Sequence, residues 1–163
     1  MRAGYRRRVL VRRLATLLAL GCLALLAACT PTIGTEPAAD AADPACAPVM
    51  LALPDVVAGD LERTKVTAQA TAAWGDRGAA VTLRCGVEQP PPSPDCQRFD
   101  SPNGTVDWVV EENDEGTWRF TTYGREPAIQ VTVPPTVTEG HSTSFIVDLT
   151  SAIDLIPATR QCT

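Results

Sequence analysis

The sequence contains only one histidine, His141, and none of its six cysteines belongs to a Cys-x-x-Cys pair. Structural zinc sites are built from closely spaced cysteine and histidine ligands, so no metal site is expected. No Gly-x-Ser-x-Gly segment is present to hold a nucleophilic serine on a sharp turn, and no glycine-rich phosphate-binding loop occurs. The sequence therefore predicts a protein without a metal, a cofactor or a catalytic nucleophile, and we do not expect an enzyme.

Basic residues are scarce in most of the chain. Six of the 14 lysines and arginines lie within residues 1–28, which leaves eight against 19 acidic residues and a net charge of about −11. Nucleic-acid binding needs a basic face, so nucleic acid is not expected as a partner. Anionic lipid head groups would repel the same surface.

Residues 1–28 have the pattern of a secretory signal peptide, with arginines followed by an apolar run from Leu14 to Ala28. The run ends in Leu26-Ala27-Ala28-Cys29, which resembles the lipobox of bacterial lipoproteins, where the cysteine is acylated and becomes the mature N-terminus. Cys22 follows a poorer match. We therefore expect a lipoprotein that is anchored through Cys29, carrying palmitate or a similar acyl group, to the extracytoplasmic face of the plasma membrane.

Two alternatives stay open for this N-terminal segment. An uncleaved membrane anchor is the first, although the apolar run is shorter than the about 20 residues that cross a bilayer. The second concerns the export route: Arg6-Arg7 is compatible with twin-arginine export, while general secretion also tolerates such starts.

The remainder of the chain divides into two parts. Residues 29–45 contain almost no large apolar side chain, which predicts a flexible lipid-anchored tether. Residues 46–163 are long enough for one hydrophobic core and too short for two, so we expect a single globular domain.

Four cysteines follow Cys29, and an even number in an oxidising compartment indicates two disulfide bonds. The four are Cys46, Cys85, Cys96 and Cys162. They allow three pairings. We favour Cys85–Cys96 across a proline-rich loop and Cys46–Cys162 between the ends of the domain.

Hydrophobic patterning predicts an α+β fold, with one mostly antiparallel sheet of about five strands and an N-terminal and a C-terminal helix packed on it. The first helix is expected to end near Leu53 because Pro54 follows, and the last to run from Phe145 to Ile156. Residues 88–101 contain a proline cluster and are expected to be a loop. The strands are expected at residues 66–74, 79–85, 106–110, 118–120 and 128–133.

One set of aromatic, arginine and acidic residues could form a ligand site. It comprises Trp74, Arg84, Asp107, Trp108, Tyr123 and Arg125. Tryptophan rings stack on sugars and arginine forks bind carboxylates, so convergence of these side chains would suit a cell-wall glycan or an anionic group. The competing interpretation is that the tryptophans belong to the core and the arginines pair with acids such as Asp107 and Asp76.

Five segments follow one another behind the lipobox: Ala73-Trp74-Gly75-Asp76, Leu83-Arg84-Cys85-Gly86-Val87, Val106-Asp107-Trp108, Thr121-Thr122-Tyr123-Gly124-Arg125 and Val131-Thr132-Val133-Pro134. Together and in this order they resemble the actinobacterial family known as domain of unknown function 3515. Arg77 departs from the pattern, because a proline is expected after the aspartate. The resemblance covers nearly the whole domain and implies an exported lipoprotein without implying a reaction.

The leading prediction is a non-catalytic envelope lipoprotein whose domain binds a partner in or near the cell wall. The alternative is an enzyme acting on envelope glycan or peptide, with Asp107 or Asp76 as acid or base beside the tryptophans. A solute-binding accessory to a transporter is a third possibility.

Overall fold

The structure is a computed structural model that describes residues 31–163. The predicted signal peptide and the lipidation of Cys29 lie outside the described residues. Within the described part, no helix is long and apolar enough to cross a membrane.

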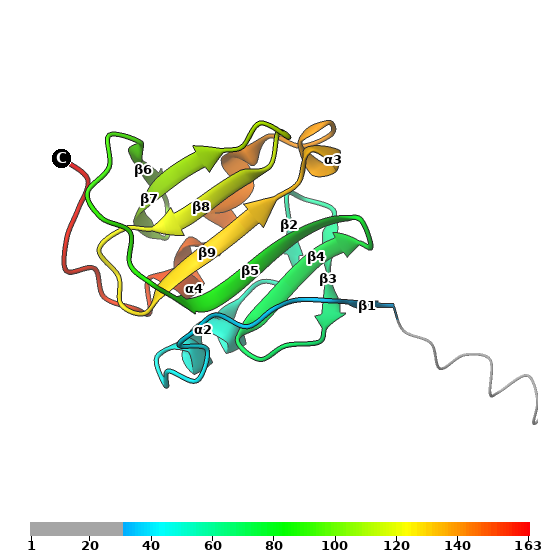
Figure 1. Ribbon diagram of the computed structural model, residues 1–163, viewed down its shortest axis with the longest axis horizontal. Helices are drawn as coiled ribbons and strands as arrows, with labels where there is room; N and C mark the ends of the chain where they lie inside the picture. The colour runs from blue at the N-terminus through cyan, green and yellow to red at the C-terminus, as the bar shows by residue number, and fades with distance from the viewer. Residues whose placement is uncertain (1–30) are drawn as a thin grey trace, which may run out of the picture. The chain divides into compact units, whose positions relative to one another are not determined.

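A sheet of nine strands dominates the described part of the chain (Figure 1). The strands are β1 (Thr32–Ile33), β2 (Val56–Val57), β3 (Leu61–Val66), β4 (Thr71–Asp76), β5 (Ala79–Val87), β6 (Cys96–Ser101), β7 (Gly104–Glu112), β8 (Trp118–Thr122) and β9 (Ala128–Val133). Their order is β1-β3-β4-β5-β9-β8-β7-β6, with β2 paired to β3. All the pairs are antiparallel except β1 with β3.

Short helices cover one face of this sheet. They are α2 (Cys46–Ala52), α3 (Pro135–Thr138), the 3-10 helix η2 (Thr143–Leu149) and α4 (Thr150–Ile153). Figure 1 shows α2 and α4 behind the strands. The predicted α+β fold of about five strands is therefore wrong, because the protein is mostly β with short helices.

Three local features explain the difference. The alternation over residues 66–74, expected to be one strand, contains a turn in which Ala70 has a φ of 51°, and this turn separates β3 from β4. The loop expected over residues 88–101 ends in β6, because the prolines stop at Pro94. The last expected helix is split into η2 and α4, although its four apolar residues, Phe145, Leu149, Ile153 and Ile156, are all buried.

The core lies between the helices and the face of the sheet that they cover. Alternate strand residues point into it, as expected from the period-2 pattern of a half-covered sheet. Fully buried members include Trp74, Leu83, Trp108, Phe120, Ile129 and Val131 from strands, and Val49, Ile146, Leu149 and Ile153 from helices. The intervening residues of the same strands point to the opposite face, which no helix of residues 31–163 covers and which we call the uncovered face.

Residues 32–45 belong to the folded domain. β1 pairs with β3, the Ala38 and Ala41 side chains are buried, and the Asp40 amide donates a hydrogen bond of 3.0 Å to the Gly86 carbonyl. The compact unit spans Thr32–Thr163. The flexible tether predicted over residues 29–45 is therefore wrong for residues 32–45. Backbone pairing and the buried side chains of Ile33, Ala38 and Ala41 fix this segment, although Ile33 is its one large apolar residue.

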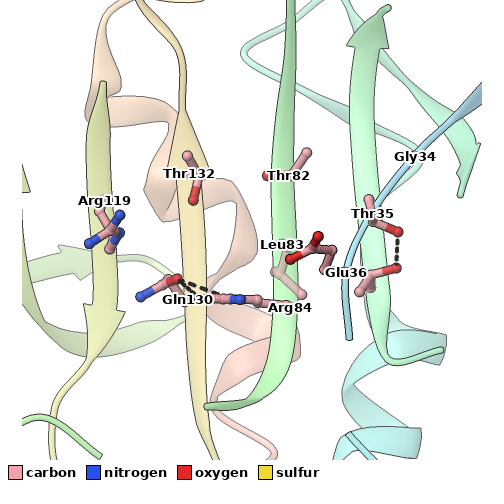
Figure 2. A pocket seen from close by; sticks show the side chains of 10 residues that line it. Gly34, Thr35, Glu36, Thr82, Leu83, Arg84, Arg119, Gln130 and Thr132 are labelled. Atoms are coloured by element: carbon pink, nitrogen blue, oxygen red, sulfur yellow. Dashed lines mark hydrogen bonds between the residues drawn. The ribbon is translucent and has the colours of Figure 1, made fainter. Parts of the chain in front are cut away.

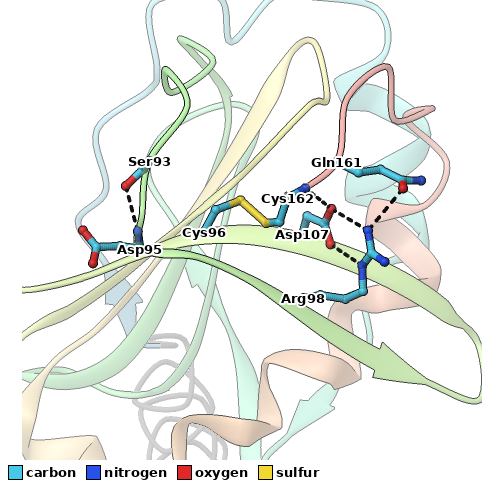
Figure 3. The surroundings of a disulfide bond; sticks show 7 residues. All are labelled: Ser93, Asp95, Cys96, Arg98, Asp107, Gln161 and Cys162. Atoms are coloured by element: carbon cyan, nitrogen blue, oxygen red, sulfur yellow. Dashed lines mark hydrogen bonds and ion pairs between the residues drawn. A yellow bond between two sulfur atoms is a disulfide. The ribbon is translucent and has the colours of Figure 1, made fainter.

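The expected two disulfide bonds are confirmed, but the favoured pairing is wrong. Cys46 bonds to Cys85 and Cys96 bonds to Cys162. Cys85 points into the core beneath α2, which begins at Cys46. Cys96 points to the uncovered face, where the C-terminal segment reaches it (Figure 3). Cys85 and Cys96 are close in sequence but point to opposite faces of the sheet, which prevents a bond between them.

Candidate functional site

The structure places the two candidate tryptophans in the core. Trp74 is 0% and Trp108 is 1% exposed. The Trp74 indole donates a hydrogen bond of 2.9 Å to the Pro54 carbonyl, and the Trp108 ring packs edge-on against Phe120 with 6.1 Å between ring centroids. Neither ring can stack on a ligand, so the core interpretation holds for both residues.

Arg125 is buried and acts as a structural bridge. It is only 2% exposed. Its Nη1 donates to the carbonyls of Ile153 and Ile156, and its Nη2 donates to the Thr105 carbonyl and pairs with Asp154 at 2.9 Å. The guanidinium therefore joins β7 to the C-terminal end of α4 and is not available to a ligand.

Asp107 and Tyr123 lie on the uncovered face under the C-terminal segment. The Asp107 carboxylate accepts hydrogen bonds from Arg98 Nε at 3.0 Å and from the Cys162 amide at 2.7 Å (Figure 3). This carboxylate raises the pKa of the Arg98 guanidinium above its ordinary value, through the hydrogen bond and through its charge. The Tyr123 ring is covered by the Arg160 guanidinium, 5.4 Å from the ring centroid.

These contacts surround a cavity of about 170 Å³, which is lined by Arg98, Asp107, Tyr123 and Arg125 among others. Three of its charged groups already have partners, because Asp107 pairs with Arg98 and Arg125 pairs with Asp154. The Asp100 carboxylate, which also lines the cavity, accepts a hydrogen bond of 2.7 Å from the Thr105 hydroxyl. The contacts around this cavity hold the C-terminal segment on the sheet.

Arg84 is the candidate residue that lies in an open groove of the uncovered face. The groove has a volume of about 300 Å³. We call it the arginine groove and define it by Thr82, Arg84, Arg119, Gln130, Thr132 and Glu36, which line it together with several neighbours (Figure 2). It lies over β5, β9 and β8, and the segment that follows β1 forms one side.

Strand register brings these side chains together. Thr82 is opposite Thr132, and Thr132 is opposite Arg119. Arg84 is opposite Gln130 in the neighbouring row. Side chains directly opposite each other in antiparallel strands have Cβ atoms about 4.5–5.5 Å apart, so both rows face one small area.

The Arg84 guanidinium is held by an uncharged partner. Its Nε and Nη2 donate to Gln130 Oε1 at 3.0 and 2.7 Å, and Gln130 Nε2 donates to Thr121 Oγ1 at 3.1 Å. Over residues 31–163, Arg84 forms no ion pair. The charge of Arg84 is therefore oriented but not neutralised.

Arg84 is the one residue of the groove among the candidates expected from the sequence. Alternation along the strand expected at residues 79–85 places Thr82 and Arg84 on the face opposite to the buried Val81 and Leu83, as in the structure. Arg119 could have been found in the same way, because Trp118 and Phe120 on either side of it pack against the core. Glu36 could not, since its segment was expected to be a free tether.

Comparison with known protein families gives a match over most of the chain. The model of the family described as "Protein of unknown function (DUF3515)" matches residues 11–161. No curated protein and no solved structure matches the chain.

Proposed function

This chain belongs to the DUF3515 family, and for this member we propose an exported, lipid-anchored, non-catalytic binding domain of the cell envelope. The match over residues 11–161 confirms the family that the five sequence segments predicted. The family description assigns no activity, so the proposal rests on the residues of the chain itself.

Support for export comes from the cysteines. Disulfide bonds persist in oxidising compartments outside the cytosol. The two bonds, Cys46–Cys85 and Cys96–Cys162, use all four cysteines of the described residues. Together with the signal-like residues 1–28 and the Leu26-Ala27-Ala28-Cys29 segment, they support anchoring through Cys29 on the outer side of the plasma membrane.

The observation that carries the binding role is the arginine groove on the uncovered face. Its side chains stand on paired strands in fixed register, and Gln130 orients Arg84. Sites on regular strands are held more precisely than sites on loops. A polar groove with an oriented, unneutralised charge suits a polar ligand from the envelope, either a soluble one or part of a wall component.

The enzyme alternative receives no support from the arrangement of its residues. It required Asp107 or Asp76 beside the tryptophans. Trp74 and Trp108 point into the core, whereas Asp107 points to the opposite face and is paired with Arg98. Asp76 is exposed at the end of β4.

Metabolic labelling with palmitate tests the anchor. The full chain, its Cys29→Ser variant and a Cys22→Ser control would be expressed in a bacterial host that processes lipoproteins. We expect the Cys29→Ser variant to lose the label and to leave the membrane fraction, while the Cys22→Ser control keeps both properties. Retention of the label by the Cys29→Ser variant would contradict the proposed anchor.

A further inference from the structure

The partner of Arg84 differs from the partners of Arg98 and Arg125, the two arginines around the cavity under the C-terminal segment. Arg98 and Arg125 each pair with a carboxylate at about 3 Å. Arg84 instead donates twice to the neutral Gln130 amide oxygen, which fixes the guanidinium plane without cancelling its charge. A planar guanidinium with free donors on its other edge matches the two oxygens of a carboxylate or phosphate.

Arg119 adds a second positive charge to the same groove. Its Nη1 is 3.9 Å from Glu111 Oε2, and both side chains are more than half exposed, so this pair is weak. Rotation of the long arginine side chain would bring its head over Thr132, which is its cross-strand neighbour. Two arginines can therefore face one anion from adjacent rows of the sheet.

The remaining lining residues supply neutral donors and one acid. The Thr82 and Thr132 hydroxyls are opposite each other between the two arginines. Glu36 is the acid that lines the groove, and Figure 2 shows it across β5 and β9 from Arg119. The groove therefore carries a net positive charge in a domain whose overall charge is about −11, which favours an anion over a cation at this place.

We propose that the arginine groove binds an oxyanion, either a carboxylate or a phosphate group of a small ligand, between Arg84 and Arg119. Gln130 is a positioning residue that aims the Arg84 guanidinium. The inference rests on the proposed function, because it gives the ligand chemistry of the same face. The buried tryptophans supply no stacking surface, so the anionic group, and not a sugar ring, provides recognition.

Calorimetric titration of the full chain in uncharged detergent tests the proposal. The probes are glucuronate for the carboxylate, glucose 1-phosphate for the phosphate and glucose as the neutral reference, all at constant ionic strength. We expect one or both anions to bind more tightly than glucose, and the tighter anion identifies the source of the oxyanion. Their affinity should fall as salt is added, because the charges are exposed to solvent.

Three variants locate the site. Arg84→Gln should weaken anion binding at least tenfold, which corresponds to about 1.4 kcal/mol. Gln130→Glu should weaken anion binding to a similar extent, because it gives Arg84 a carboxylate partner. This variant should keep its stability, so that its loss of binding cannot be caused by unfolding. Arg160→Gln, outside the groove, should bind as the unsubstituted chain does.

Two results would overturn the oxyanion inference. The first is binding of glucose as tight as that of both anions, which leaves a binding role for the groove but removes its anion selectivity. The second is an anion affinity that is the same in the unsubstituted chain and in the Gln130→Glu variant. A complete absence of anion binding in the unsubstituted chain would overturn the inference as well. Failure of the anchor, by contrast, would appear only in the palmitate labelling of the Cys29→Ser variant.

Discussion

The Cys162 amide donates a hydrogen bond of 2.7 Å to Oδ2 of Asp107, which lies 55 positions earlier in the chain. The contact is adjacent to the Cys96–Cys162 disulfide, and Arg98 donates to the same carboxylate. The sequence suggested Asp107 as a ligand-binding or acid-base residue. In the structure its carboxylate instead binds the C-terminal segment to the sheet.

Replacement of Asp107 with Asn should destabilise the domain by about 1–3 kcal/mol, because the buried carboxylate accepts charge-assisted hydrogen bonds that an amide cannot all replace. Urea unfolding at neutral pH measures the loss. Asp95→Asn is the matched control: Asp95 is exposed near the same disulfide (Figure 3), and its replacement should change the stability by less than about 0.5 kcal/mol. Equal stability of the two variants would contradict the proposed role of Asp107 in binding the C-terminal segment.

The contribution of the Arg98–Asp107 pair to the unfolding free energy should not change as the pH rises over the ordinary working range. Asp107 raises the pKa of Arg98 in the folded state. A raised pKa contributes stability that is fully present below the unfolded-state value and is lost only as the pH rises through the folded-state value. The difference in unfolding free energy between the unsubstituted chain and an Arg98→Gln variant should therefore stay constant from about pH 7 to 10. A difference that falls within this range would contradict the prediction.

Each disulfide should contribute about 4 kcal/mol in the chain-entropy model, because the closed loops span 39 and 66 residues. We expect similar losses of stability for the paired replacements Cys46→Ala with Cys85→Ala and Cys96→Ser with Cys162→Ser. Mass spectrometry of a non-reduced digest gives the pairing independently. A peptide that joins Cys85 to Cys96 would contradict the structure.

The sequence predicted those features that depend on short-range patterns. The strands expected at residues 79–85, 106–110, 118–120 and 128–133 follow from the alternation of apolar and polar residues, and all four are present as parts of β5, β7, β8 and β9. These features need no knowledge of distant parts of the chain.

The errors concern long-range contacts. Whether Cys46 reaches Cys85 or Cys162 depends on the face of the sheet to which each side chain points, and that depends on the register of strands far apart in sequence. The same limit applies to the site: alternation predicts that Arg84 points outward, but only the pairing of β5 with β9 reveals Gln130 as its partner.

Gly86 should tolerate no side chain, because it holds the N-terminal segment against the sheet. A Cβ at this position would lie 2.4 Å from backbone atoms of Asp40, and the residue has a φ of +98°. We expect Gly86→Ala to destabilise the domain and to expose residues 32–45 to limited proteolysis. Gly59→Ala is the control, since Gly59 has a similar φ of +88° but no atom near its Cβ position. Its expected cost is about 1–2 kcal/mol from backbone strain alone, and equal costs for the two variants would contradict the packing of residues 32–45.

Arg125 should contribute to stability and not to ligand binding. Replacement with Met keeps much of the side-chain volume but removes the donors to the carbonyls of Thr105, Ile153 and Ile156. Unsatisfied buried acceptors cost about 1–3 kcal/mol each, so a loss of about 2–4 kcal/mol is expected after partial rehydration. Asp154 is 52% exposed and can be solvated without its partner, which keeps the loss of stability below that of a fully buried ion pair.

Urea unfolding measures the stability of the Arg125→Met variant, and titration with glucuronate and glucose 1-phosphate below the unfolding transition measures its anion binding. Unchanged anion affinity in a destabilised variant would separate the bridge from the arginine groove, whereas a tenfold loss of affinity with unchanged stability would place the ligand at Arg125 instead.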